Sequence, residues 1–380
     1  MPTSGRQSST AGSGQDRQLP ILRAVPWVEL MTRSHVTRHF SIREACHAGR
    51  VTSRTPGHLN GALARLAFMA LLLPAPALAS EAQEPIRIGV LTPAWGPPGG
   101  LEGLVEGLID LGYRENEDFV IGLRFTQGDL SALPAVAEAM VEGGVDLIFA
   151  AGEHAARAAQ GATSTHPIIF RLVGDPIEQG LIVSYDRPGG NVTGISDLDL
   201  AVSGKRLQLF KELVPGLMRV LFLYDKHNNY DAAQAELYRT AAQRLNVVFE
   251  ERQVGTEEEA LAALAEVREK EIDGFLTPHD VSLNIPGLVL ELAAAEKIPS
   301  MHSSSIYLAE GGLASYGGAP NASGRQAARL IHKIIKGADP AELPVETEQR
   351  LEFGINLKTA RDFGIVVPRE VLFQADQIIR

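Results

Sequence analysis

Acidic and histidine side chains follow several apolar runs that the sequence predicts to be parallel strands. The loops concerned read Gly-Glu-His at 152–154, Gly-Asp-Pro at 174–176, Asp-Lys-His-Asn at 225–228 and Pro-His-Asp at 278–280. The carboxyl ends of parallel strands form the ligand-binding edge of an open sheet, so we expect these side chains to line one cleft. The acids are Glu153, Asp175, Asp225 and Asp280, and the histidines are His154, His227, His279 and His302.

A cleft of this composition suits a ligand that carries an amine or another cation. Carboxylates accept strong, charge-assisted hydrogen bonds from an ammonium group. Trp95, which follows the first predicted strand, would add an apolar or cation–π wall. The alternative is that acids in these loops cap helices, and Asp280 stands where such a cap is expected, directly before a predicted helix. The sequence leaves both interpretations open for each residue.

Signatures of catalysis are missing from the sequence. It contains no G-x-S-x-G, G-x-x-x-x-G-K-[ST] or H-E-x-x-H motif. No two of the strand-end histidines stand four residues apart, a spacing typical of metal ligands on a helix. Histidine and carboxylate side chains, which are ligands for Zn²⁺, are nevertheless present, so metal binding stays an alternative. We predict no catalytic residue, no metal ligand and no cofactor. An enzyme would have to use His279 or Asp280 as its general base.

The elements that position these loops alternate between short apolar runs and amphipathic stretches, which indicates two α/β lobes with parallel sheets. Strands are predicted at 86–91, 118–125, 145–151, 167–173, 219–224, 247–252, 274–277 and 299–303. Helices are predicted at 101–111, 130–142, 153–162, 203–213, 230–245, 256–270, 281–297 and 321–336. The segment 187–193 is predicted to be a turn, and the chain after residue 336 is predicted to be irregular. Gly100 and Gly103 are predicted to allow a helix to pack closely against a strand.

Charge is divided unevenly along the 380 residues, which carry a formal net charge of −11. Residues 1–79 hold nine arginines and three acids, a balance of +6, which leaves −17 for the rest and argues against nucleic-acid binding. The apolar run 66–73 and Ala77-Leu-Ala79 predict a signal peptide cleaved after Ala79, with 1–50 an over-extended start. A buried helix or a membrane anchor is the alternative. The mature chain would contain no transmembrane segment and no cysteine, since Cys46 is removed, and would be periplasmic.

Local motifs resemble a known family over residues 85–380. The motifs are Phe170-x-x-Val-Gly-Asp-Pro176, Arg187-Pro-Gly-Gly-Asn-Val-Thr-Gly194, Gly204-Lys-Arg-Leu207, Gly312-Leu-Ala-Ser-Tyr-Gly317 and Ile355-Asn-Leu-Lys-Thr-Ala360. They are similar to the ABC transporter substrate-binding family that includes tryptophan- and tyrosine-binding lipoproteins. The resemblance implies a type I periplasmic binding protein fold, with two Rossmann-like lobes joined by a hinge. The lobes would comprise 85–193 with 313–345, and 194–312 with 346–380.

The family implies that a monomer captures a small solute between its lobes, closes about the hinge and delivers the solute to an ABC permease driven by an ATPase. A ligand-sensing subunit for a membrane receptor is the alternative. Where many relatives have Gly-Thr or Gly-Ser, this chain has Gly152-Glu153, and Glu153 would repel a ligand carboxylate. An amino acid is still expected, with an amine-bearing solute as the competing choice. The candidate ligand-binding residues are Trp95, Gly152, Glu153, Asp175, Asp225, Asn228, Asp280, Ser303, Ser304, Tyr316 and Gly317.

Overall fold

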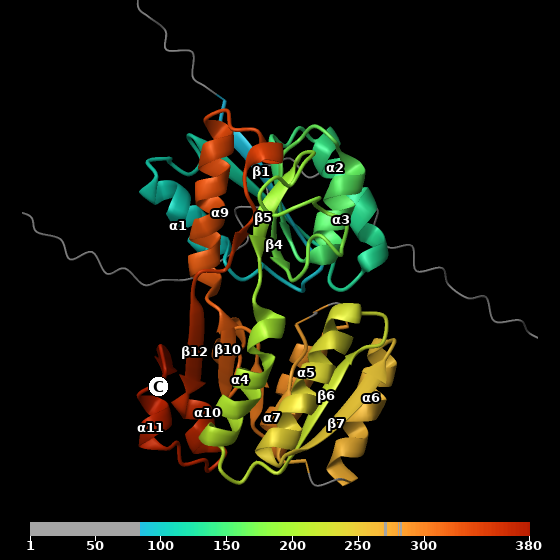
Figure 1. The fold of residues 1–380 in the computed structure, drawn as a ribbon, viewed down its shortest axis with the longest axis vertical. Coiled ribbons are helices and arrows are strands. Elements are labelled where there is room, and N and C mark those ends of the chain that lie inside the picture. The colour runs from blue at the N-terminus through green and yellow to red at the C-terminus, as the bar shows by residue number, and fades with distance from the viewer. Residues whose placement is uncertain (1–83, 270–271, 280, 282) are drawn as a thin grey trace, which may run out of the picture. The chain divides into compact units, whose positions relative to one another are not determined.

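Two open sheets organise the part of the chain that the computed structural model describes, which is residues 84–380 without 270–271, 280 and 282 (Figure 1). The predicted signal peptide, Ala79, Cys46 and Asp280 lie outside the described residues. In the first sheet the strand order is β11-β5-β4-β3-β1-β2, and every pair is parallel. The order in the second is β13-β12-β10-β9-β8-β6-β7, with only β10 and β12 antiparallel. The predicted α/β fold class is confirmed.

The first sheet is built by β1 (Ile86–Thr92), β2 (Phe119–Phe125), β3 (Leu147–Ala151), β4 (Ile168–Val173), β5 (Val192–Ser196) and β11 (Glu346–Thr347). Its helices are α1 (Leu101–Asp110), α2 (Leu133–Glu142), α3 (Glu153–Ala162) and α9 (Pro320–Ile335). Helices α1 and α9 lie on one face and α2 and α3 on the other (Figure 1). Strands covered on both faces need near-continuous apolar sequence, and Leu147–Ala151 is buried at every position.

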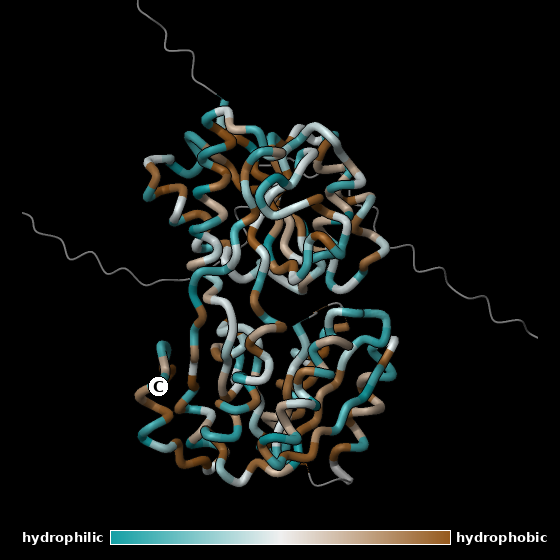
Figure 2. The backbone as a smooth tube through the Cα atoms, viewed as in Figure 1, coloured by the Kyte–Doolittle hydropathy of each residue, from teal (hydrophilic) through white to brown (hydrophobic). Residues whose placement is uncertain are grey.

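The second sheet is built by β6 (Arg219–Asp225), β7 (Val248–Val254), β8 (Gly274–Leu276), β9 (Ser300–His302), β10 (Ala314–Gly318), β12 (Leu351–Asn356) and β13 (Gln377–Ile379). Its helices are α4 (Asp199–Leu213), α5 (Asn229–Leu245), α6 (Glu257–Ala265), α7 (Ile285–Glu296), α8 (Ile306–Ala309), α10 (Leu357–Asp362) and α11 (Arg369–Leu372). Apolar residues follow the strands of both sheets (Figure 2), and Phe222 and Phe275 are fully or almost fully buried. None of the helices in the described part of the chain is long and apolar enough to cross a membrane.

Three segments connect the two sheets, at 197–198, 319 and 348–350. They are tied together by backbone hydrogen bonds, because Glu348 N donates to Ser196 O and Ala319 N donates to Arg350 O, both at 2.9 Å. These positions differ from the lobe boundaries expected at 193, 312 and 345. Strand β5 continues to Ser196, β10 pairs with β9 and β12 of the second sheet, and β11 pairs with β5 of the first.

Several predicted elements begin or end elsewhere. The predicted turn at 187–193 already contains the start of β5, and the predicted helix 203–213 begins four residues earlier, at Asp199. The predicted helix 281–297 begins at Ile285, with Pro286 in its first turn, where the missing N–H costs nothing. After residue 336 the chain is not irregular, because β12 and β13 extend the second sheet. These strands pair with partners distant in sequence, which local patterns do not reveal.

Glycines allow α1 and α9 to pack closely. A Cβ atom at Gly103 would stand 2.6 Å from the Cα atom of Asn321 and against its carbonyl oxygen. A Cβ at Gly324 would lie 2.7 Å from the backbone nitrogen of Leu104 and against the carbonyl oxygen of Gly100. The helix–strand packing predicted for Gly100 and Gly103 is therefore wrong, because these glycines serve a helix–helix contact.

Replacing Gly103 with alanine should lower the free energy of unfolding by about 1–3 kcal/mol, since the obstructing atoms belong to the backbone of a neighbouring helix. The matched control is Gly161→Ala in α3, where an added Cβ meets nothing within 4 Å. That change should stabilise the protein by about 0.5–1 kcal/mol through helix propensity. Denaturant titration of both variants checks the prediction, and equal effects at the two sites would contradict it.

Candidate functional site

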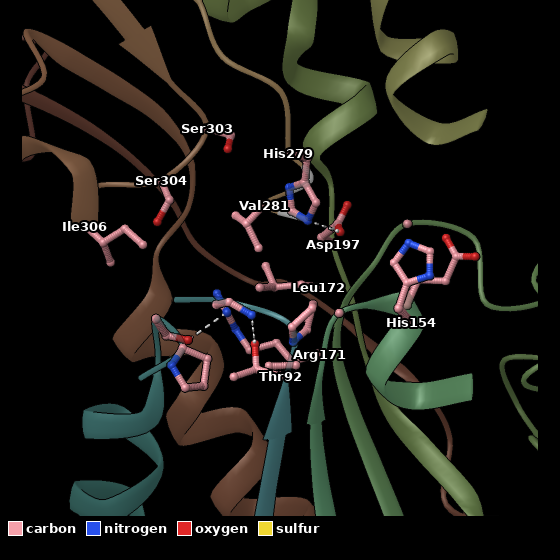
Figure 3. A pocket seen from close by; sticks show the side chains of 18 of the residues that line it. Thr92, His154, Arg171, Leu172, Asp197, His279, Val281, Ser303, Ser304 and Ile306 are labelled. Atoms are coloured by element: carbon pink, nitrogen blue, oxygen red, sulfur yellow. Dashed lines mark hydrogen bonds and ion pairs between the residues drawn. The ribbon is translucent and has the colours of Figure 1, made fainter. Parts of the chain in front are cut away.

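A cavity of about 140 Å³ lies between loops from the two sheets. The first sheet contributes the loops after β1, β3 and β4, at 92–99, 151–154 and 171–174. The second contributes the loops after β6, β8 and β9, including Tyr230, His279 and Ile306. Asp197, in the first connecting segment, completes the lining (Figure 3). All these loops follow the carboxyl ends of strands, the location at which open parallel sheets bind ligands.

Five of the predicted ligand-binding residues line this cavity: Gly152, Glu153, Asn228, Ser303 and Ser304. Two of them also have local structural roles. The Oδ1 atom of Asn228 accepts a hydrogen bond from Asp231 N at 3.1 Å and caps α5. Glu153 Oε1 accepts from Arg157 Nε at 3.2 Å along α3, so its charge is already paired. The cavity therefore contains both capping residues and side chains available to a ligand.

Asp175 and Asp225 have capping roles and lie outside the residues that line the cavity. Asp175 Oδ1 accepts from the backbone nitrogens of Ile177 and Glu178 at 3.1 and 3.0 Å. Asp225 Oδ1 accepts from His227 N at 2.9 Å. An aspartate that caps a turn and one that binds a cation occupy the same place in a loop, so their sequence patterns coincide.

The other predicted ligand-binding residues do not line the cavity, or lie outside the described residues. Trp95 is 45% exposed and does not line the cavity, although its neighbours do. The Tyr316 ring packs edge-on against Phe353, and its carbonyl oxygen accepts from a buried arginine. Gly317 lies against the carbonyl of Ser303, where a Cβ would not fit. Asp280 is outside the described residues, so its predicted role stays a prediction.

The strand-end histidines do not form a common site. His154 and His279 line the cavity. His302 is fully buried between Thr277 Oγ1 at 3.1 Å and Ser300 Oγ at 2.9 Å, and burial lowers its pKa to about 3. His302 is therefore a neutral core residue at neutral pH. Within residues 84–380, as far as they are described, no group of three histidine, cysteine or acidic side chains is arranged to hold a metal ion.

A buried ionic cluster lies beside the cavity, and the sequence pattern does not indicate it. Asp199 accepts a hydrogen bond from Arg206 Nη2, and the side chains of both are almost completely buried. The same arginine donates to Tyr238 Oη at 2.7 Å and to Tyr316 O at 2.6 Å. This pair joins α4, α5 and β10 beside the connecting segments. Arg206 stands in a polar part of its predicted helix, so the sequence contained no signal for its burial.

A second buried ion pair joins Arg171 to Glu348, with 3.4 Å between Nη2 and Oε1. Arg171 also donates to Ser323 Oγ at 2.5 Å and to Gly99 O at 2.8 Å. Burial raises the pKa of Glu348 to about 7, because the removal from water, helped by the carboxylates of Asp197 and Asp199, outweighs the attraction of Arg171. An arginine inside the apolar run of β4 was the sequence signal for this pair.

Asp197 is a buried acid that lines the cavity. Its Oδ1 atom accepts from Tyr230 Oη at 2.6 Å and from Asp199 N at 3.1 Å. Its Oδ2 atom accepts no hydrogen bond from any described residue, and His279 Nε2 lies 3.5 Å from it (Figure 3). Burial, with the nearby carboxylate of Asp197, raises the pKa of Tyr230, which therefore remains a hydrogen-bond donor. The cavity wall thus contains a buried carboxylate oxygen that receives no hydrogen bond from the described residues.

Two sheets linked by three connecting segments, with a cavity at the strand ends, define a type I periplasmic binding protein fold. The sequence profile of the ABC transporter substrate binding protein family matches residues 99–379. The chain belongs to this family, as its motifs indicated. The family is one of substrate-binding proteins.

Relatives of known structure or function agree with this assignment. The chain is 30% identical over 262 residues to the tyrosine-binding protein of Clostridioides difficile, covering 68% of this chain and 75% of that protein. It is similar to an ABC domain from Streptococcus pneumoniae in complex with L-Trp, with 28% identity, a TM-score of 0.68, and coverage of 78% and 100%. A conserved domain protein of Vibrio cholerae has 26% identity, a TM-score of 0.67, and coverage of 77% and 99%.

Proposed function

We propose that the protein is the extracytoplasmic solute-binding component of an ABC importer and captures an amino acid, or another small amine-bearing molecule, in this cavity. The observation that carries the proposal is the lining of one cavity by loops from both sheets, which three short segments of the described chain connect. A ligand that touches both sides binds a closed arrangement better than an open one and shifts the population toward it. The closed form would then be recognised by a permease with its ATPase.

The cavity lining supports an aromatic or other large side chain on the ligand. Pro97, Pro98, Leu172, Val281 and Ile306 supply apolar surface, and one group of polar side chains is formed by Asp197 with Tyr230 and His279. Ligand sites of this kind are mostly apolar, with a few polar groups that fix orientation. The two relatives named for tyrosine and solved with L-Trp make these amino acids the first compounds to test. Export with cleavage after Ala79, a periplasmic location and a monomeric state complete the proposal.

Filling the cavity should abolish ligand capture. Ser304→Trp places a large ring among the lining residues and should weaken binding of L-tryptophan or L-tyrosine at least about tenfold, a loss of about 1.4 kcal/mol. The control is Val366→Trp, at a position 87% exposed and away from the cavity lining, which should keep wild-type affinity. Isothermal titration with both amino acids measures this, and native mass spectrometry of freshly purified protein would reveal a retained ligand. Failure of the wild type to bind amino acids or amines would overturn the proposed function.

A further inference from the structure

We propose that the carboxylate of Asp197 is the subsite for the ammonium group of the ligand, so that the protein selects solutes carrying a protonated amine. The inference rests on the proposed function, because it takes the cavity to be the ligand site. It assigns recognition to Asp197, which follows β5 in the first connecting segment, in place of the four acids that the sequence pattern indicates, Glu153, Asp175, Asp225 and Asp280.

Asp197 differs in its partners from the two other acids of the ionic cluster beside the cavity. The three acids, Asp197, Asp199 and Glu348, are each less than 10% exposed. Two arginines are buried with them, and each is committed, Arg206 to Asp199 and Arg171 to Glu348. Burying a carboxylate without a cation is costly, so such groups are paired or neutralised. Of these three acids, Asp197 is the one that forms no ion pair with an arginine or lysine of the described residues, and the cationic group nearest to it is the imidazole of His279 at 3.5 Å.

The geometry of Asp197 favours a cation that comes from the cavity. Its side chain is 3% exposed, and the hydrogen bonds from Tyr230 and Asp199 fix Oδ1, which leaves Oδ2 as the acceptor without a donor. An ammonium group brings three N–H donors and a positive charge. It would supply the missing donor to Oδ2 and a positive charge beside the carboxylate, and hydrogen bonds to charged groups contribute about 1.5–3 kcal/mol each.

Two other side chains near the cavity could take part in this interaction. His279 could be the cation beside Asp197, and Glu153 could be the acceptor for the ammonium group, but both fit less well. His279 places Nε2 at 3.5 Å from Asp197 and Nδ1 at 3.6 Å from Asp199, beyond good hydrogen-bond length. It lies between the two acids and forms a wall with Tyr230, whose ring centre is 5.5 Å away. Glu153 also lines the cavity, but it is paired with Arg157 at the start of α3. Asp197 is therefore the better acceptor for a ligand cation.

The proposal is tested by varying the ligand and the residue together. The ligands are L-tryptophan, tryptamine, which lacks the carboxylate, and indole-3-propionate, which lacks the amine; the corresponding tyrosine series is measured in parallel. The wild type should bind the deaminated compounds at least about tenfold more weakly than the amino acids. Asp197→Asn should weaken binding of the amino acids and amines by about 10- to 100-fold and should leave the deaminated compounds unchanged.

The matched control is Asp175→Asn, which changes an aspartate outside the cavity lining and should retain wild-type affinities. Thermal unfolding shows whether each variant is folded, and the comparison of ligands on the wild type alone keeps the test valid if Asp197→Asn does not fold. Equal binding of amino and deaminated compounds by the wild type, or unchanged affinity in a folded Asp197→Asn, overturns the inference but leaves the proposed function. Absence of binding by every compound overturns the proposed function as well.

Discussion

Arg206→Leu should lower the free energy of unfolding by about 3–5 kcal/mol, the loss expected when one partner of a buried ion pair is removed. The Arg206 side chain is fully buried, and its departure leaves Asp199 charged in the interior with Gln234 as its remaining close donor. Tyr238 and the carbonyl of Tyr316 lose a hydrogen bond as well. Urea denaturation followed by circular dichroism measures the change.

Two further variants separate this mechanism from a general effect of losing an arginine. Arg325 pairs with Glu106 and Asp110, but its side chain is 41% exposed, so Arg325→Leu should cost less than about 1 kcal/mol. The double variant Arg206→Leu/Asp199→Leu removes both buried charges and should recover much of the lost stability. A loss below 1 kcal/mol in Arg206→Leu, or no recovery in the double variant, would contradict the account.

Glu348→Gln should change how stability depends on pH. The pKa of the Glu348 carboxyl group is about 7 in the folded protein, above its ordinary value of 4.5. Between pH 4.5 and pH 7 the folded state therefore retains a proton that the unfolded state has lost. The wild type is therefore fully stabilised below about pH 4.5 and loses this stability as the pH rises to about 7. The shift in pKa corresponds to a loss of stability on the order of 3 kcal/mol. Glutamine resembles the protonated acid, so Glu348→Gln should match the wild type at pH 4.5 and exceed its stability at pH 8.

The groups that face Glu348 set this behaviour. Arg171 favours the ionised carboxylate, as His279 does when protonated, whereas Asp197 and Asp199 disfavour it. Unfolding midpoints at pH 4.5–8 should therefore diverge between wild type and Glu348→Gln. The control Glu342→Gln, in an exposed pair with Arg187, should follow the wild type throughout. Parallel profiles of wild type and Glu348→Gln would show that the carboxyl group does not titrate in this range.

Much of the fold could be predicted because its signals are local. The apolar runs of β1, β3 and β4 mark strands buried on both faces, and amphipathic stretches mark the helices between them. The parallel arrangement then places the strand-end loops on one edge, which is why Gly152 and Ser303 were found at the cavity. The sequence pattern predicts none of β10, β12 and β13, because those short strands depend on partners from distant parts of the chain.

The sequence by itself determined the alternation of elements, the family and the edge on which a ligand site had to lie, since each depends on local pattern or characteristic motifs. Only the tertiary structure decided which acids cap turns and which are buried beside the cavity. Arg171 and Glu348 are 177 residues apart in sequence, and their contact requires the connecting segments to meet. The same meeting of the connecting segments pairs the two buried arginines with Asp199 and Glu348 and leaves Asp197 without an arginine in an ion pair. Pairing of buried charges depends on distances of a few ångströms, and only the folded arrangement fixes those distances.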